Sequence, residues 1–499
     1  MTAALQFSGA WQGAAGNRLM GPWRVWENDP NSDWTNEAAS LSVRAWDLVR
    51  NDPVMAALLT AKIIGTHGAE GLRLRSQYSA DRIEAVSDAE VEIRRHVEDE
   101  VAAATSIDAT GLMTRHEFEE ALDELATVSG ESFAVRLFIP DRPGATTATC
   151  WRIIRPERVC NPPGKTDSNA LYQGLALDDN GAIAGIWIAP PRRMGSAMPR
   201  HDDWAFVPWY AEDGSRNVIH RIGKRMPGSY RGVSLFAANI PLAKQIKGVL
   251  DAYVVAKRVQ ACHPIFISCD DPLAAAAADR NGAVWGPNTT LEPGKVYYVG
   301  RDASVNFSTW SFQGADMREF LDTLYRNQFA ALGMPIDVVL AQLGNTNMAA
   351  SRSAWLQYYR QCTRWQDDHI EQVSRVLDEA IIREAVARGR LSFPADMPWP
   401  RIMCGRYVRP PRSMPDPLKE AMAVKAWVEL GRDRTGLFAE SGVDFRDSIV
   451  QRADDDRWME SQGVESAEDA AEAAEPAPAE AEPAKPDEEA PPKPEEKQP

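Results

Sequence analysis

The spacing of apolar and polar residues divides the chain into helical and extended stretches. Between 36 and 64, after a first turn that fits no single stripe, apolar residues recur at helical intervals, with a break at Asp52-Pro53. Proline interrupts a helix because it lacks a backbone N–H, so a kink or a new start is expected there. Thr114 and Glu117 have the spacing of a capping box, which predicts a helix ending before Gly130.

The period then changes from helical to extended. The segments 132–139, 149–154 and 185–189 are short, rich in β-branched and aromatic residues, and bounded by Pro, Gly and Asp-Asn turns. Strands that follow helices in this way are typical of an α+β domain with antiparallel strands, here spanning about 130–225.

Two helical segments farther along enclose a segment rich in strands and turns. Residues 241–260 and 317–332 have the helical period, and 263–309 contains the short apolar runs. As isolated hairpins, the predicted strands Pro264–Ser268 and Lys295–Val299 would leave exposed edges, which favour pairing with a neighbouring chain.

The longest predicted element follows a loop at 333–350 whose second half is rich in Asn. Residues 351–388 contain neither Pro nor Gly, and a helix of that length would span roughly 57 Å. Such a length is typical of helices that pack in an assembly. A Pro-rich connection at 390–416 and two closing helices, at 417–430 and 443–459, complete the predicted fold.

Composition adds that the net charge is concentrated at one end. The formal charge of the 499-residue chain is −16, and residues 465–499 contain 12 Asp and Glu against three Lys. This Ala/Glu/Pro-rich tail cannot form a core and is expected to be disordered. The rest is close to neutral, which argues against a protein that grips nucleic acid with a broadly basic surface. Residues 1–40 are expected to form an irregular arm.

The tested motifs do not support enzymatic chemistry. Gly164-Lys165-Thr166 lacks the earlier glycine of a phosphate-binding loop, the seven histidines never fall four residues apart, and no Cys pair has C-x-x-C spacing. The sequence also contains no apolar run long enough for a transmembrane helix. We therefore expect no catalytic residues, no metal site, no cofactor and no membrane partner.

Several motifs, in order along residues 45–460, together resemble a known family. They are Ala45–Pro53 (AWDLVRNDP), Ile64–Gly68 (IGTHG), Gly130–Ala134 (GESFA), Tyr230–Ser234 (YRGVS), Asn345–Arg352 (NTNMAASR), Asp416–Ala421 (DPLKEA) and Gly442–Asp444 (GVD). This set resembles the lambda-type portal proteins of tailed bacteriophages, although that family more usually has Tyr-Ser-Ser after the Asn of the fifth motif.

The resemblance implies a ring, usually a dodecamer, at one vertex of the phage head and therefore in the virion, assembled in the host cytoplasm. Double-stranded DNA would be pumped through the ring by the terminase large subunit and would later leave through it. The implied partners are further copies of the chain, that terminase, a head-tail adaptor and the major capsid protein.

The predicted elements can be assigned to the parts of a portal subunit. The resemblance implies an N-terminal arm (1–40), an α+β wing (41–237), a stem helix (238–262), a clip (263–309), a second stem helix (310–332), a tunnel loop (333–350), a long wing helix with its connection (351–416), a helical crown (417–464) and the acidic tail (465–499).

Two groups of residues are then the candidate sites. A short uncharged polar loop can touch phosphates without holding them, so the tunnel loop is expected to line the DNA channel through Gln342, Asn345, Thr346, Asn347 and Met348. The clip is expected to dock terminase or adaptor through Asp270, Asp271, Arg280 and Asn281.

Two other readings of the sequence remain open at this point. One is a head-tail connector or adaptor of different fold, although the long helix and the size of the ordered body disfavour the usual small adaptors. The other is a multidomain hydrolase whose catalytic residues are dispersed along the chain.

Overall fold

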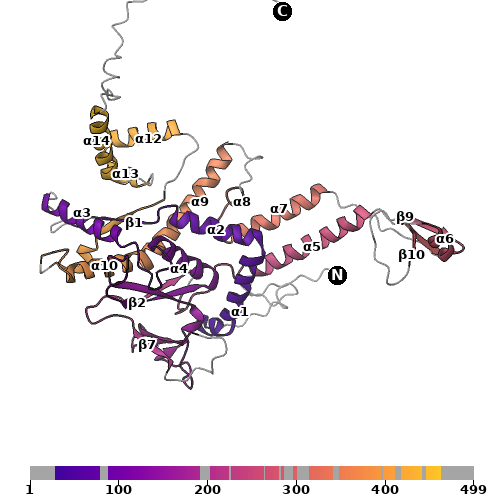
Figure 1. The fold of residues 1–499 in the computed structure, drawn as a ribbon, viewed down its shortest axis with the longest axis horizontal. Coiled ribbons are helices and arrows are strands. Elements are labelled where there is room, and N and C mark those ends of the chain that lie inside the picture. Colours follow the sequence, from indigo (N-terminus) through magenta and orange to yellow (C-terminus); the bar gives the residue numbers. More distant parts are fainter. Residues whose placement is uncertain are drawn as a thin grey trace, which may run out of the picture.

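The computed structural model describes residues 29–78, 88–191, 203–223, 226–262, 265–279, 282–285, 296–300, 314–340, 348–394, 397–410, 417–440 and 445–461. The fold mixes helices with small sheets (Figure 1), as the α+β prediction expected. Within the described residues, no helix is long and apolar enough to cross a membrane.

The first two helices meet at a single aspartate. Helix α1 (Pro30–Asn51) ends where α2 (Pro53–His67) begins, and the Asp52 carboxylate accepts hydrogen bonds from the backbone N–H groups of Val54 and Met55. The break predicted at Asp52-Pro53 is therefore confirmed, and Asp52 caps the second helix.

Helix α1 corrects the expectation of an irregular arm up to residue 40. The helix starts at Pro30, and Asp29 caps it. The Trp34 side chain attaches the first turns of α1 to the body. Its indole N–H donates to the Gly232 carbonyl at 2.7 Å, and the Arg231 guanidinium lies 4.4 Å from its ring centroid. Such contacts leave no apolar stripe in the sequence.

A second pair of helices precedes the main sheet. Helix α3 (Asp88–Ala103) is followed by α4 (Arg115–Ser129), whose predicted capping box between Thr114 and Glu117 is present. Helix α4 ends at Gly130, which has a φ of 102°, in the left-handed region that favours glycine.

Two antiparallel sheets follow. The first has the order β3-β2-β8, from β2 (Glu131–Phe138), β3 (Thr149–Ile154) and β8 (Val218–Ile222). The second has the order β4-β5-β6-β7, and between β3 and β4 lies the 3-10 turn η2. The bounds are Pro156–Arg158 for η2, Leu171–Tyr172 for β4, Leu175–Leu177 for β5, Ile183–Ile188 for β6 and Ala205–Pro208 for β7.

The apolar faces of the two sheets share one core. Phe133 and Val218 of the first sheet cluster with Leu175, Ile186 and Ile188 of the second, and all are buried. The antiparallel strands predicted for this region are confirmed.

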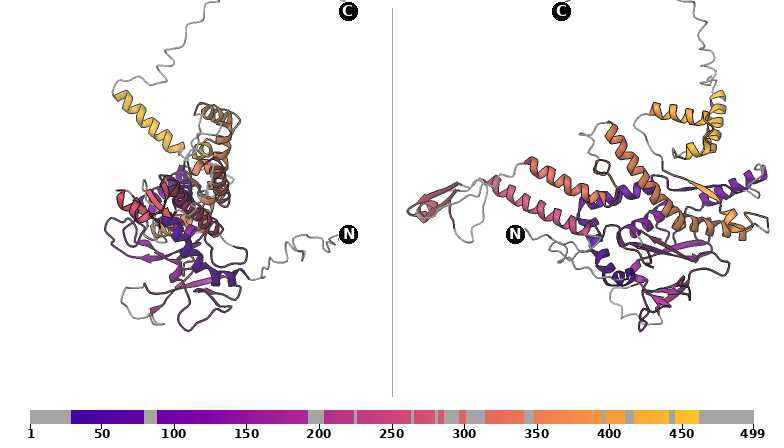
Figure 2. Two further views of the ribbon diagram at one scale, coloured as in Figure 1. Left: turned by 90° about the vertical axis from the view of Figure 1, so that its right-hand side faces the viewer. Right: turned by 180° about the vertical axis from the view of Figure 1, so that it is seen from behind.

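Two long helices project from this body toward a small sheet (Figures 1 and 2). Helices α5 (Ile240–Cys262) and α7 (Gly314–Ala330) lie side by side, and the sheet lies beyond their far ends. It has the order β10-β11-β9 and carries helix α6. The bounds are Ile265–Cys269 for β9, Pro272–Ala278 for α6, Gly282–Val284 for β10 and Val296–Gly300 for β11.

This small sheet corrects the picture of isolated hairpins. Strand β11 pairs with both β9 and β10, and both pairings are parallel. Parallel neighbours need a crossover rather than a tight turn, and helix α6 lies in the segment between β9 and β10. The sequence pattern located the strands but not their direction.

The long helix is confirmed as one nearly continuous element. Helix α9 (Met348–His369) continues through a π-helical turn (Ile370–Ser374) into α10 (Arg375–Ala387), and Gly389 follows with a φ of 70°. A single-turn helix, α8 (Ile336–Val339), lies within the predicted tunnel loop.

The C-terminal third contains elements that the sequence did not reveal. The predicted connection at 390–416 includes α11 (Trp399–Ile402) and strand β12 (Gly405–Val408), which pairs antiparallel with β1 (Arg73–Ser76). Three closing helices are described instead of two: α12 (Pro417–Glu429), α13 (Arg434–Glu440) and α14 (Phe445–Ser461).

Gly130→Ala tests the close approach at the end of α4. A Cβ at Gly130 would lie 2.6 Å from the backbone carbonyl carbon of Val233, in addition to the strain of its positive φ. We expect a loss of about 3 kcal/mol in the free energy of unfolding, measured by urea denaturation. Gly144→Ala is the matched control, because Gly144 has a φ of 73° but open space around it, and it should lose only about 1 kcal/mol. Equal losses in the two variants would contradict the packing argument.

Candidate functional site

The predicted channel residues adjoin two well-anchored helices. Gln342, Asn345, Thr346 and Asn347 lie outside the described residues, between α8 and α9, and Met348 is the first residue of α9. The described positions closest to this segment are therefore Leu340 and Met348.

Both sides of segment 341–347 pack on α2. Leu332 and, within the predicted tunnel loop, Met334 and Ile336 share a buried cluster with Leu58 of α2 and Trp365 of α9.

The end of α2 makes the close packing with α9 possible. A Cβ at Gly65 would lie 2.5 Å from the hydroxyl of Tyr358, which donates to the Ala61 carbonyl at 2.6 Å. The glycine of the IGTHG motif therefore allows α9 to approach α2 closely.

Of the four predicted docking residues, two lie within the described part of the chain and two lie outside it. Asp271 caps α6 by accepting from the backbone N–H groups of Leu273 and Ala274, and Asp270 precedes it. Arg280 and Asn281 lie outside the described residues. The structure therefore places two of the four predicted residues at the start of α6, at the far end of the α5–α7 pair (Figure 1).

Two motifs that lie a hundred residues apart meet in a buried ion pair. Glu131 of GESFA accepts from the Arg231 Nε of YRGVS at 2.6 Å, and its other oxygen lies 2.8 Å from His220 Nε2. Burial alone would raise the pKa of Glu131, but Arg231 and His220 hold it below its ordinary value.

The two terminal nitrogens of Arg231 form hydrogen bonds to backbone carbonyls. They donate to Pro156, Val159 and Gln173 at 2.5–3.2 Å. Arg231 thus joins the start of β2 to the segments around η2 and β5.

A second buried network fills the space between α2, α4, β8 and the long helix. Asp123 of α4 contacts Lys62 Nζ at 2.5 Å and Arg221 Nη2 at 3.0 Å, and all three side chains are at most 3% exposed. Burial lowers the pKa of Lys62 to about 8, against the attraction of Asp123. Burial would raise the pKa of Asp123, but the two cations hold it well below its usual range.

The same network extends along α4 to the π-helical turn. Glu119 accepts from Ser374 Oγ at 2.7 Å and contacts His369 Nε2 at 3.2 Å. Arg115 pairs with Glu119 at 2.9 Å and with Asp378. Three cations thus face three carboxylates within the protein interior.

Comparison with known proteins identifies the family of this chain. The sequence model described as phage portal protein, lambda family, matches residues 16–366. This chain belongs to the lambda family of phage portal proteins. The match contains the motifs through the NTNMAASR run, including both halves of the Glu131–Arg231 pair, and ends within α9.

Individual relatives of this portal chain are distant. Portal protein B of Escherichia phage lambda is 22% identical over 356 residues, and the match covers 66% of this chain and 66% of that protein, so the chain spans about two thirds of its relative. Two solved assemblies contain similar chains: the virion of a native gene transfer agent particle (14% identity, TM-score 0.36) and the neck of an empty gene transfer agent particle computed with C6 symmetry (15%, 0.37). Each match covers 74% of this chain and 92% of the other.

Among the residues that the structure describes, one group of side chains has metal-ligand chemistry. His67, Asp123 and His369 are fully buried, and one donor atom of each lies within 4.8 Å of the others. Asp123 already carries ion pairs to Lys62 and Arg221, so a divalent ion there would meet two fixed positive charges. The arrangement therefore fits a charge-balanced structural network better than a metal centre.

Sequence reasoning could not find this network. Its members come from α2, α4, β8 and the long helix, and the two histidines are about three hundred positions apart. Local spacing therefore carries no signal for their contact.

The portal chain should lose stability below neutral pH through His369. Burial, and then repulsion from His67, lower the pKa of His369 to about 4, whereas an unfolded histidine titrates near 6.5. The folded state then binds this proton less tightly, so the stabilising contribution is complete above about pH 6.5 and declines as the pH falls toward 4. Between pH 7 and pH 5 we expect a loss of about 2 kcal/mol in the free energy of unfolding, measured by urea denaturation.

His369→Gln should remove most of that pH dependence, because glutamine does not titrate. His96→Gln on the exposed face of α3 is the matched control and should retain the dependence of the parent. A decline of equal size in the parent and in His369→Gln would contradict the assignment to His369.

Proposed function

We propose that this chain is one subunit of a portal ring at a single vertex of a phage head. Double-stranded DNA enters the head through the ring during packaging and leaves through it on ejection, and the ring joins head to tail. The observation that carries the proposal is the family match over residues 16–366. The role is mechanical and requires no cofactor and no catalytic residue.

Each region of the fold can be assigned to a part of such a ring subunit. In this proposal the body of α1–α4 with its two sheets is the wing, α5 and α7 are the stem, and the small sheet with α6 is the clip. The segment 333–350 is the tunnel loop, and 417–464 form the crown. The terminase large subunit and the head-tail adaptor dock at the clip, near Asp270, Asp271, Arg280 and Asn281, and the major capsid protein surrounds the ring.

Exposed apolar side chains on the projecting helices support assembly into a ring of about twelve copies. Val254 and Val255 of α5 are 45% and 58% exposed, and Phe320 of α7 is 51% exposed. At the small sheet, Leu273 and Trp285 are also exposed. Exposed apolar surface of this kind is typical of protein interfaces, and a neighbouring copy would cover it.

The uncharged loop fits a channel through which DNA slides. Each cation placed against a phosphate adds affinity through counterion release, so a basic ring would hold DNA. Gln342, Asn345, Thr346 and Asn347 offer hydrogen bonds without charge. In this proposal they line the narrowest part of the bore.

Val255→Asp tests the ring. The wild-type chain should form particles of about twelve times 55.1 kDa with a central hole in negative-stain images, with the mass measured by light scattering. The charged variant should remain folded by circular dichroism but shift toward monomer, because a carboxylate would be buried at the interface. Val255→Thr is the matched control and should still form rings. Unchanged assembly of Val255→Asp would exclude this face of α5 from the interface.

The double variant Asn345→Lys and Asn347→Lys tests the channel. It should slow DNA translocation in a packaging assay with purified terminase, most strongly at low salt, because each subunit would add two phosphate contacts. Asn345→Gln with Asn347→Gln keeps the loop polar and uncharged and should package at the parent rate. If the lysine variant packages at the parent rate at low salt, the loop does not line the bore.

A further inference from the structure

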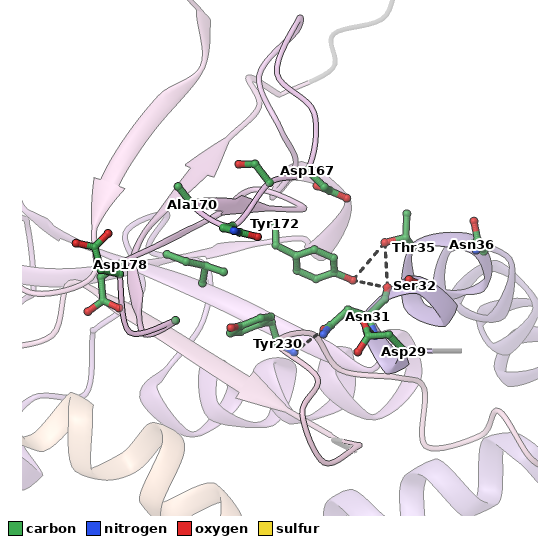
Figure 3. Close-up of a pocket in the computed structure, with 15 residues that line it drawn as sticks. Asp29, Asn31, Ser32, Thr35, Asn36, Asp167, Ala170, Tyr172, Asp178 and Tyr230 are labelled. Carbon is green, nitrogen blue, oxygen red and sulfur yellow. Dashed lines mark hydrogen bonds between the residues drawn. The ribbon is translucent and has the colours of Figure 1, made fainter. Parts of the chain in front are cut away.

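An open groove lies beside the start of α1 on the body (Figure 3). The start of α1 forms one side, and the segments around β4 and the β5–β6 turn form the other, with Tyr230 below. Asn31, Thr35, Tyr172 and Tyr230 line it together with Asp29, Asp167, Asp178 and Asp179.

The groove is strongly anionic and contains two tyrosines. Four carboxylates line it, and none of the described residues that line it is Lys or Arg. Asp178 and Asp179 are both exposed at the β5–β6 turn. Tyr230 is partly exposed and Tyr172 is buried beside it, and the two ring centroids are 5.9 Å apart. Cationic and aromatic side chains suit such a surface, through Coulomb attraction and cation–π contacts.

Hydrogen bonds between its two sides fix the geometry of the groove. The Tyr172 hydroxyl donates to the Asn31 carbonyl at 2.6 Å, and Asn31 Oδ1 accepts from the Tyr230 backbone N–H at 3.1 Å. The Asp167 carboxylate accepts from Asn161 and Gln173, which lowers its pKa against the effect of burial. The groove is therefore a preorganised surface in which these hydrogen bonds favour the charged form of Asp167.

The chain itself supplies a segment of complementary chemistry at the edge of this groove. Residues 1–28 precede Asp29, which is one of the lining residues. Residues 16–26 contain Arg18, Arg24, Trp23 and Trp26 and no acidic residue. An extended chain rises at most about 3.5 Å per residue, so Arg24 can lie up to about 18 Å and Arg18 up to about 39 Å from Asp29.

We propose that residues 16–26 of the same chain dock in this groove, with Arg18 and Arg24 facing its carboxylates and a tryptophan against the partly exposed Tyr230. Covalent attachment at Asp29 gives the segment a high effective concentration at the groove, so modest contacts suffice to hold it. The family match begins at residue 16, so residues 16–26 lie within the matched region. The inference concerns the surface of the subunit and does not depend on the ring or on the DNA channel.

Site-specific photo-crosslinking in the full-length chain tests the proposal. A benzoylphenylalanine at Ala170, an exposed lining residue, should form an intrachain crosslink to residues 16–26, identified by mass spectrometry of the tryptic digest. The same probe at Leu112, an exposed position outside the groove, is the control and should not reach that segment.

Charge-reversal variants then test whether the segment is held by electrostatic attraction or is only tethered near the groove. Asp178→Lys with Asp179→Lys should reduce the crosslink yield about three- to tenfold, as should 1 M salt, because exposed ion pairs are weak and screened. Adding Arg18→Asp and Arg24→Asp should restore the yield. These four positions are at the surface or outside the described residues, and circular dichroism checks the fold of each variant.

Two outcomes would overturn the proposal. Crosslinks from Ala170 that map to a different copy of the chain would show that the groove takes a neighbour's segment instead. Crosslinks outside residues 16–26, or a yield indifferent to charge reversal and its compensation, would show that the groove does not recognise this segment.

Discussion

The buried pair of Glu131 and Arg231 is the constraint on which the body of this protein depends. The Arg231 guanidinium is 1% exposed, and its acceptors come from β2, η2 and the segment before β5, with the Trp34 ring of α1 packed against it. Removing one member of such a pair leaves an uncompensated buried charge, which typically costs 3–5 kcal/mol. The pair therefore fixes where α1, the first sheet and the second sheet meet.

Much of the architecture could be predicted because its signals are local. The capping box at Thr114, the break at Asp52 and the unbroken helical pattern after residue 350 each act within one or two turns. The start of α1 could not be predicted, because Trp34 is held by Arg231 and Gly232, almost two hundred residues away. For the same reason the β1–β12 pair, and the parallel direction of β9 and β11, were missed: short strands carry no local mark of their partners.

The candidate sites could be predicted only in part from the sequence. The motifs that suggested the family turned out to be physical contacts: Gly130 packs on the backbone of Val233, Glu131 binds Arg231, and Gly65 lets Tyr358 approach. No local sequence pattern predicts the second network, because Lys62, Asp123 and His369 come from distant segments of the chain. For the loop predicted to line a channel, the sequence shows polar residues without charge, and the structure shows the packed helices α8 and α9 on either side.

The π-helical turn explains how one long helix serves both regions. A π turn adds a residue to the helical repeat, and here it brings His369 and Ser374 to the same carboxylate of Glu119 while Gln372 accepts from the backbone N–H of Ile222. The C-terminal half of the helix is thereby fixed to α4 and β8, and its N-terminal half packs on α2 through Tyr358 and Trp365. Segment 341–347 therefore precedes a helix that is held along its length by contacts to α2, α4 and β8.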